Sequence, residues 1–196
     1  MQAARGASLK PSDQATDEPS SRRRRSRSRL VFALVALAAY ALDIITKQLA
    51  LRHLEDGDIA VLGDWFTLHL THNPCAAFST GTEYTVVFSV LAVVAVGVVL
   101  WVSRRLGSAF WAVGLGLLLA GVAGNLTDRL VREPGPMRGH VIDFLMLPNW
   151  PVFNVADICI NVAAGIIILQ SFRGIGVDGR RHTADEEDDA PEGGRP

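Results

Sequence analysis

Four aspartates stand in or beside long apolar segments of the chain, where a charged side chain needs a reason to be kept. An ionisable residue inside a membrane-spanning helix costs about 2.5–3.5 kcal/mol on insertion scales. Two carboxyl groups held close together in such surroundings share one proton, because both cannot ionise easily. One member of such a pair can activate water while the other protonates a scissile carbonyl. The four acids are Asp43, Asp128, Asp143 and Asp157.

Amide side chains accompany the last of these acids. Asn154, Asp157 and Asn161 follow an i, i+3, i+7 spacing, which predicts one polar stripe on an otherwise apolar helix. We expect this stripe to face other helices and not lipid. Hydrogen bonding between helices by the asparagines is the alternative explanation, but amides alone would serve for that and a carboxylate is costlier.

A third amide precedes the second acid. Asn125, Asp128 and Arg129 are spaced i, i+3, i+4 and are expected to share the outer end of one helix. Small residues recur every four positions from Gly116 to Gly124, which predicts a smooth face for close helix packing. An ordinary helix terminus is the alternative reading of Asp128 and Arg129.

The remaining two acids have simpler structural explanations beside the chemical one. Lys47 lies one helical turn after Asp43 and can pair with it, and an ion pair that orients the helix would account for both. Asp143 is a lone acid in a short apolar run, which also fits an interfacial loop. Spacing alone does not decide which two of Asp128, Asp143 and Asp157 would work together.

Other chemistries find little support in the sequence. There is no serine in a nucleophile-elbow setting and no phosphate-binding loop, and neither Cys75 nor Cys159 has an obvious histidine partner. His69 and His72 are expected on opposite faces of a strand, so a metal site is not predicted. Carboxylate catalysis, proton or cation transport, and a purely structural role remain.

The elements that must position these acids are long and apolar. The chain has 196 residues, a length that predicts one domain, and 49% of them are hydrophobic. Four nearly uncharged runs approach the ~20 residues that a membrane-spanning helix needs. A soluble bundle and a cleaved signal peptide at 22–41 are the alternatives. The prediction is a membrane all-α fold over 30–172, with spans at about 30–51, 84–103, 106–127 and 152–172.

The net charge of -1 hides two oppositely charged tails. Residues 1–29 hold eight Lys or Arg against three Asp or Glu, and residues 173–196 hold four against seven. Both are expected to be disordered. The arginines before the first span, between the second and third spans, and after the fourth place both termini in the cytoplasm. No basic folded domain accompanies them, so nucleic acid is not an expected partner.

Both longer loops, about 52–83 and 128–151, then lie outside the membrane. Residues 65–72 alternate apolar and polar side chains, which predicts a strand in the first of these loops and a small strand-containing region outside. Helix-rise arithmetic puts all four acids at or just below the outer surface. A transporter would need acids at several depths, so this common level counts against that alternative.

Five segments in order on four spans complete the pattern, and together they resemble the lipoprotein signal peptidase (signal peptidase II) family of bacteria. The resemblance covers about 30–172 and leaves out both tails. The segments are 43–47 (DIITK), 73–79 (NPCAAFS), 124–129 (GNLTDR), 141–144 (VIDF) and 153–157 (FNVAD).

The resemblance implies an aspartic endopeptidase of the bacterial cytoplasmic membrane. It would cut prolipoprotein signal peptides just before the cysteine that carries a diacylglyceryl group, with lipid-modified precursors and membrane lipids as partners and no metal or organic cofactor. The active site would lie near the extracytoplasmic face, and the oligomeric state stays open. The implied catalytic residues are Asp143 and Asp157; the implied substrate-binding or supporting residues are Asn73, Asn125, Asp128, Arg129, Asn154, Asp43 and Lys47.

The chain departs from the family pattern at two positions. Cys75 stands where the family usually has glycine, which adds a side chain to a tight outer loop that would contact substrate. Ile158 follows the second implied catalytic aspartate, where serine is common.

Overall fold

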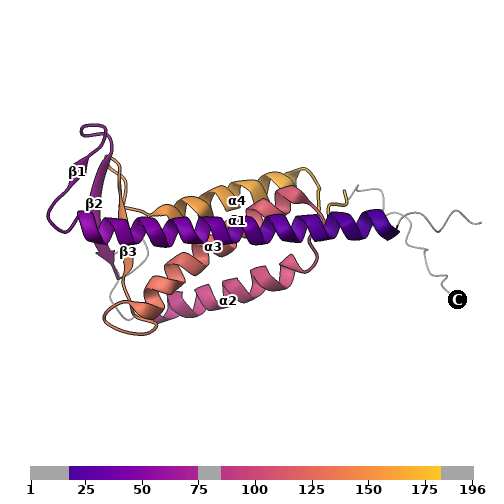
Figure 1. The fold of residues 1–196 in the computed structure, drawn as a ribbon, viewed down its shortest axis with the longest axis horizontal. Helices are drawn as coiled ribbons and strands as arrows, with labels where there is room; N and C mark the ends of the chain where they lie inside the picture. Colours follow the sequence, from indigo (N-terminus) through magenta and orange to yellow (C-terminus); the bar gives the residue numbers. More distant parts are fainter. Residues whose placement is uncertain (1–17, 75–84, 182–196) are drawn as a thin grey trace, which may run out of the picture.

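The structure is a computed structural model that describes residues 18–74 and 85–181. Four helices lie roughly along one direction, and a small sheet stands at one end of them (Figure 1). We call that end the sheet end. The elements in chain order are α1 (Glu18–His53), β1 (Ile59–Ala60), β2 (Thr67–Asn73), α2 (Thr85–Ser103), α3 (Ala109–Val131), β3 (Val141–Met146) and α4 (Val155–Phe172).

All four helices are long and apolar enough to cross a membrane. The predicted fold of four spans with a small strand-containing region is therefore confirmed. Two helices are longer than expected. Helix α1 begins at Glu18, so residues 18–29, predicted to be disordered, are helical; helix α3 continues to Val131 and carries Asp128 and Arg129 within it.

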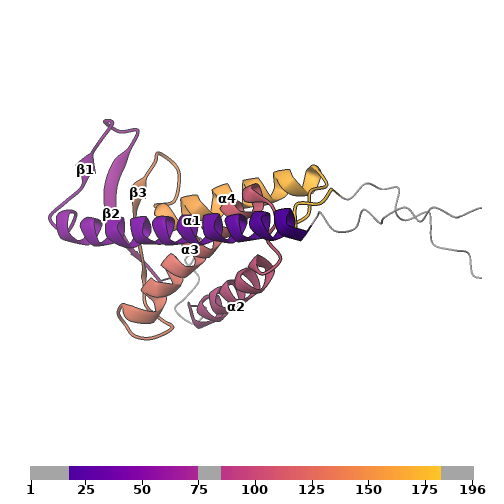
Figure 2. The ribbon, with the colours of Figure 1, turned by 45° about the vertical axis from the view of Figure 1, so that its right-hand side comes forward.

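Helix α3 is the centre of the bundle, because α1, α2 and α4 all pack against it. It runs obliquely between α4 and α2 (Figures 1 and 2). The predicted smooth face explains the packing on α1, since a Cβ atom at Gly116 would stand 3.0 Å from the Phe32 carbonyl oxygen. Gly121 allows the same close approach to α4, where it faces the Ala156 carbonyl.

The sheet is antiparallel with the strand order β1-β2-β3. Strand β2 confirms the strand predicted at 65–72, shifted to Thr67–Asn73. Strand β3 was not predicted: Asp143 lies in its middle, opposite Thr71, and not in an irregular loop. Its first four residues, from Val141 to Phe144, are buried, so the sheet presents Asp143 to the interior of the protein.

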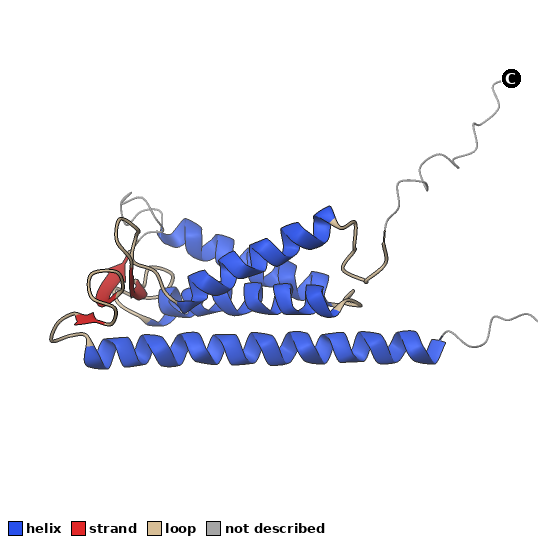
Figure 3. Cartoon of the chain, turned by 90° about the horizontal axis from the view of Figure 1, so that it is seen from above, coloured by secondary structure: helices blue, strands red, loops and turns tan. Residues whose placement is uncertain are grey.

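The opposite end of the bundle is closed by the first part of the predicted C-terminal tail (Figure 3). Trp111 Nε1 donates to the Ile175 carbonyl at 2.8 Å, and the Gly107 amide donates to the Val177 carbonyl at 3.0 Å. Arg24 Nε donates to the Gly107 carbonyl at 3.0 Å. Residues 173–181 are thus ordered against the bundle, contrary to the prediction of disorder. The predicted disorder of 1–17 and 182–196, and the effect of Cys75, fall outside the described residues.

Candidate active site

A buried lysine organises the acids at the sheet end. Lys47 is fully buried, and its Nζ lies 2.8 Å from Asp43 Oδ2, 2.8 Å from Asp128 Oδ2 and 2.9 Å from Asn125 Oδ1. The contacts with the two carboxylates are ion pairs, and Nζ donates a hydrogen bond to Asn125 Oδ1. The predicted pair of Asp43 and Lys47 is confirmed, and it extends to α3 through Asp128 and Asn125.

Asp43 also fixes the start of α4. Its Oδ1 accepts a hydrogen bond from the Ala156 backbone amide at 2.9 Å. Helix starts leave backbone amides without internal partners, and a carboxylate at that place is favourable. Gly124 makes room for this contact, because a Cβ atom there would collide with the Asp43 carboxylate.

Asp128 is fully buried, and both of its oxygens are occupied. Besides Lys47, it accepts from Arg132 Nε and, at 3.4 Å, from the Ile142 amide. The Ile142 contact ties α3 to β3. Two of its partners, Lys47 and Arg132, are cations, so Asp128 belongs to an ion cluster. Asp143 and Asp157, which accept amide hydrogens, are left as the candidates for handling water.

Asn154 joins these two acids. It is the residue that caps the N-terminus of α4: the Asp157 amide donates to Asn154 Oδ1 at 3.0 Å, and the Asn154 amide donates to Asp157 Oδ2 at 3.1 Å. Such a reciprocal capping box satisfies two helix-start amides at once. The same Asn154 donates its Nδ2 hydrogen to Asp143 Oδ1 at 2.6 Å. One asparagine therefore links the acid on the helix to the acid on the sheet.

Two more asparagines complete the arrangement. Asn125 Nδ2 donates to Asp157 Oδ1 at 2.9 Å, and Asn73 Nδ2 donates to Asp143 Oδ2 at 2.8 Å. Each carboxyl is thus held on both oxygens by amide donors. Because Lys47 occupies Asn125 Oδ1, the amide group of Asn125 is oriented with its NH₂ towards Asp157.

The environment favours a proton on Asp143. Burial in the sheet raises the pKa of Asp143 to about 6; the hydrogen bond from Asn73 lowers the pKa, and the neighbouring charge of Asp157 raises it. Desolvation and a like charge both disfavour the ionised form. A raised pKa suits a carboxyl group that has to donate a proton.

Two other residues singled out in the sequence, Arg129 and Asn161, differ in burial. Arg129 is buried, and its carbonyl accepts from the Gly139 amide at 3.1 Å. Asn161 does not face other helices as predicted; it is exposed, and its Nδ2 donates to the Asp157 carbonyl at 2.8 Å. Arg132 was missed as a partner of Asp128, although its i+4 spacing could have indicated it.

Metal binding is not indicated in the described part of the chain, where no three His, Cys, Asp or Glu side chains gather to hold an ion. His69 instead pairs with Asp58, Nδ1 to Oδ1, at 2.7 Å. The acids form one connected cluster at the sheet end, and they do not mark a path from one end of the bundle to the other. This arrangement does not favour the alternative of proton or cation transport, which would need acids at several depths.

Comparisons with known proteins point to one family. The model of the family described as "Signal peptidase (SPase) II" matches residues 35–173. A lipoprotein signal peptidase of Leifsonia xyli subsp. xyli is 45% identical over 179 residues, covering 90% of this chain and 83% of that protein. One of Mycobacterium avium is 47% identical over 158 residues, covering 79% of this chain and 87% of that protein.

Two solved structures of bacterial membrane enzymes share the fold. They are 21% and 19% identical to the chain, with TM-scores of 0.64 and 0.66. The matches cover 72% and 78% of this chain, and they cover 92% and 93% of the two solved chains. With its four long apolar helices, the chain is a multi-pass membrane protein. The chain therefore belongs to the signal peptidase II family, the aspartic-type peptidases that cleave signal peptides from lipoprotein precursors.

Proposed function

We propose that the protein is an intramembrane endopeptidase that removes the signal peptide from diacylglyceryl-modified prolipoproteins, cutting just before the lipidated cysteine with Asp143 and Asp157 as its catalytic pair. The observation that carries this proposal is the link through Asn154, which holds one carboxyl of the sheet and one of α4 in a single hydrogen-bonded unit.

The reaction needs one ionised and one protonated acid. Asp157, whose two oxygens accept hydrogens from the Asn125 side chain and the Asn154 backbone, acts as the base and takes a proton from water as the water oxygen attacks the scissile carbonyl carbon. Asp143 gives its proton to the carbonyl oxygen. When the tetrahedral intermediate collapses, the C–N bond breaks, the proton on Asp157 goes to the leaving nitrogen, and Asp143 regains its own.

The remaining residues hold the pair and the substrate. Asn125, oriented by Lys47, and Asn154 fix the position of Asp157. Asp43 and Lys47 serve as the structural pair beneath the site. Asp128 and Arg129 shape the pocket. Asn73, besides donating to Asp143, contacts the substrate.

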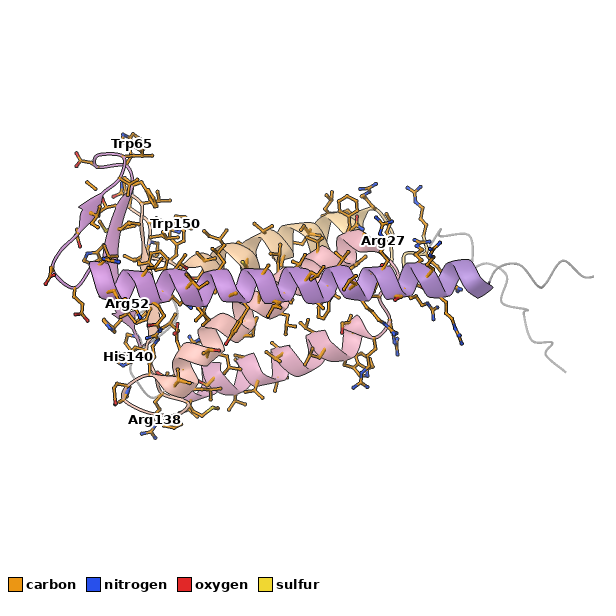
Figure 4. All side chains as sticks on the ribbon, in the orientation of Figure 1. Arg27, Arg52, Trp65, Arg138, His140 and Trp150 are labelled. Atoms are coloured by element: carbon orange, nitrogen blue, oxygen red, sulfur yellow. The ribbon has the colours of Figure 1, made fainter. Side chains whose placement is uncertain are left out.

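The site is assigned to the extracytoplasmic side of the bacterial cytoplasmic membrane. Arg27 and the other arginines near the start of α1, with Arg104, Arg105 and Arg173, lie at the end of the bundle opposite the sheet, as Figure 4 shows for Arg27. Arginine-rich ends favour the cytoplasm, so both termini are cytoplasmic. A lipidated cysteine keeps its acyl chains in the bilayer, and a shallow site at the outer surface meets the bond beside it.

Lipid dependence tests this function directly. We expect the purified protein in liposomes to cut a diacylglyceryl-modified precursor and to leave the unmodified precursor intact, with mass spectrometry finding the lipidated cysteine as the new N-terminus. Equal cutting of both precursors, or a cut at another bond, contradicts the proposal. Ion flux in the same liposomes without any cleavage would favour transport.

The proton on Asp143 makes activity depend on pH. Because the protonated form is the one required, we expect kcat/KM to fall as the pH rises through about 6, the pKa of Asp143. The Asn73→Ala variant removes a hydrogen bond that lowers this pKa, so the alkaline limb should move to higher pH even if the maximal rate drops.

A second titrating group must be excluded in this experiment. Histidine side chains change charge in this pH range, so the His69→Gln variant serves as the control and should leave the profile unchanged. A limb that disappears in His69→Gln, or one that does not move in Asn73→Ala, rules out Asp143 as its origin.

A further inference from the structure

The sheet has an apolar end as well as a catalytic one. The turn between β1 and β2 and the loop that follows β3 expose large apolar side chains, with Trp65 77%, Leu62 68% and Trp150 65% exposed. Large aromatic side chains left in water forgo substantial burial energy. We call this group the sheet apex; its residues are Val61, Leu62, Trp65, Leu147 and Trp150.

Strand pairing places the two parts of the sheet apex side by side. Thr67 pairs with Met146, so the residues just before β2 run next to those just after β3. Figure 4 agrees, with Trp65 and Trp150 on the same side of α1 as α4. Asp143 lies three residues before Met146 in the middle of the same strand, so the apex adjoins one end of the strand that carries the acid.

The sheet apex is also close to the level at which the helices end. The strands run across the helix direction and extend sideways at the sheet end (Figures 1 and 2). Trp150 precedes Val155, the first residue of α4, by five residues, so the chain between them spans at most about 18 Å. The apolar side chains therefore stand beside the lipid-facing surface of a membrane-spanning helix and not far above it.

We propose that the sheet apex inserts into the interfacial layer of the bilayer that surrounds the sheet end, with phospholipid as its partner. Tryptophan prefers this layer, because its ring is apolar while its N–H group can bond to water or headgroups. The chain leads from Trp150 through a short segment into α4, where Ile158 and Val162 are exposed. Lipid would then hold the far end of the strand that carries Asp143.

Tryptophan fluorescence tests this contact without using catalysis. The chain has four tryptophans, and the variant Trp101→Phe/Trp111→Phe keeps only Trp65 and Trp150. In nanodiscs of brominated phosphatidylcholine, we expect its emission to fall by at least half relative to nanodiscs of the unbrominated lipid. Emission equal in the two lipids, at the wavelength of tryptophan in water, overturns the proposal.

Two further arms make the result specific. The variant Trp65→Phe/Trp150→Phe keeps Trp101, which is exposed on α2, and Trp111 of α3, and supplies the signal of tryptophans on membrane spans. Emission of the Trp65 and Trp150 pair that is blue-shifted but insensitive to bromine would indicate a protein partner, such as a second copy, and would also overturn the lipid contact. Because the measurement works equally in Asp157→Asn, its failure is separate from that of the proposed peptidase function.

Discussion

Replacing either Asp143 or Asp157 with asparagine is expected to lower the rate of prolipoprotein cleavage by about a thousandfold or more, the size typical of losing positioned acid–base catalysis. Asparagine keeps the shape of the side chain and can still accept one of the two hydrogen bonds that each carboxyl receives. It can neither take a proton from water nor donate a carboxylic proton to a carbonyl. Single-turnover cleavage of a lipid-modified precursor in liposomes measures the loss.

The control must separate chemistry from folding. Asp58→Asn changes an exposed acid at the same end of the molecule and should leave the rate within about twofold, because exposed ion pairs contribute little. Thermal unfolding of the two active-site variants should stay close to that of the parent chain. Normal turnover by Asp143→Asn or by Asp157→Asn would remove that residue from the mechanism.

Replacing Lys47 with methionine is expected to destabilise the protein by about 3–5 kcal/mol, the range for breaking a buried ion pair. Two fully buried carboxylates, Asp43 and Asp128, would lose the cation that lies 2.8 Å from each. Asn125 would also lose the partner that orients its amide towards Asp157. The rate of cleavage should fall as well. The midpoint of thermal unfolding in detergent measures the loss of stability, which is the larger of the two effects.

Two further variants separate the loss of the buried ion pairs of Lys47 from the mere loss of a positive charge. Arg52→Met removes an exposed cation from the last turn of the same helix and should change the midpoint very little. The double variant Lys47→Met/Asp128→Asn removes one of the two stranded charges and should recover part of the loss. An unchanged midpoint in Lys47→Met, or no recovery in the double variant, would contradict the role assigned to this ion cluster.

The spans and the common level of the acids were accessible from the sequence because both depend on local composition. An uncharged run of about 20 residues predicts a membrane helix wherever it occurs, and the helix rise then gives the depth of Asp43 and Asp157. The helical content of 18–29 was missed because its charge suggested disorder, although arginine is a good helix former.

The parts of the site that could not be predicted depend on contacts between distant segments. Strand β3 exists because it pairs with β2, about seventy positions earlier, and a six-residue apolar run alone does not reveal that partner. Asn154 was expected to support Asp157, and its simultaneous bond to Asp143 requires the sheet to be in place. Asn161 was misplaced because a spacing gives the face of a helix but not what covers that face.

The position of Asn154 in the chain bears on how the enzyme is made. It begins the last of the four spans, and its hydrogen bonds to Asp143 and Asp157 form only when the first turn of α4 has formed. A chain whose synthesis has stopped before α4 therefore has the sheet acid without its partner. With Asp143 and Asp157 as the proposed catalytic pair, peptidase activity would begin only after the last span has formed.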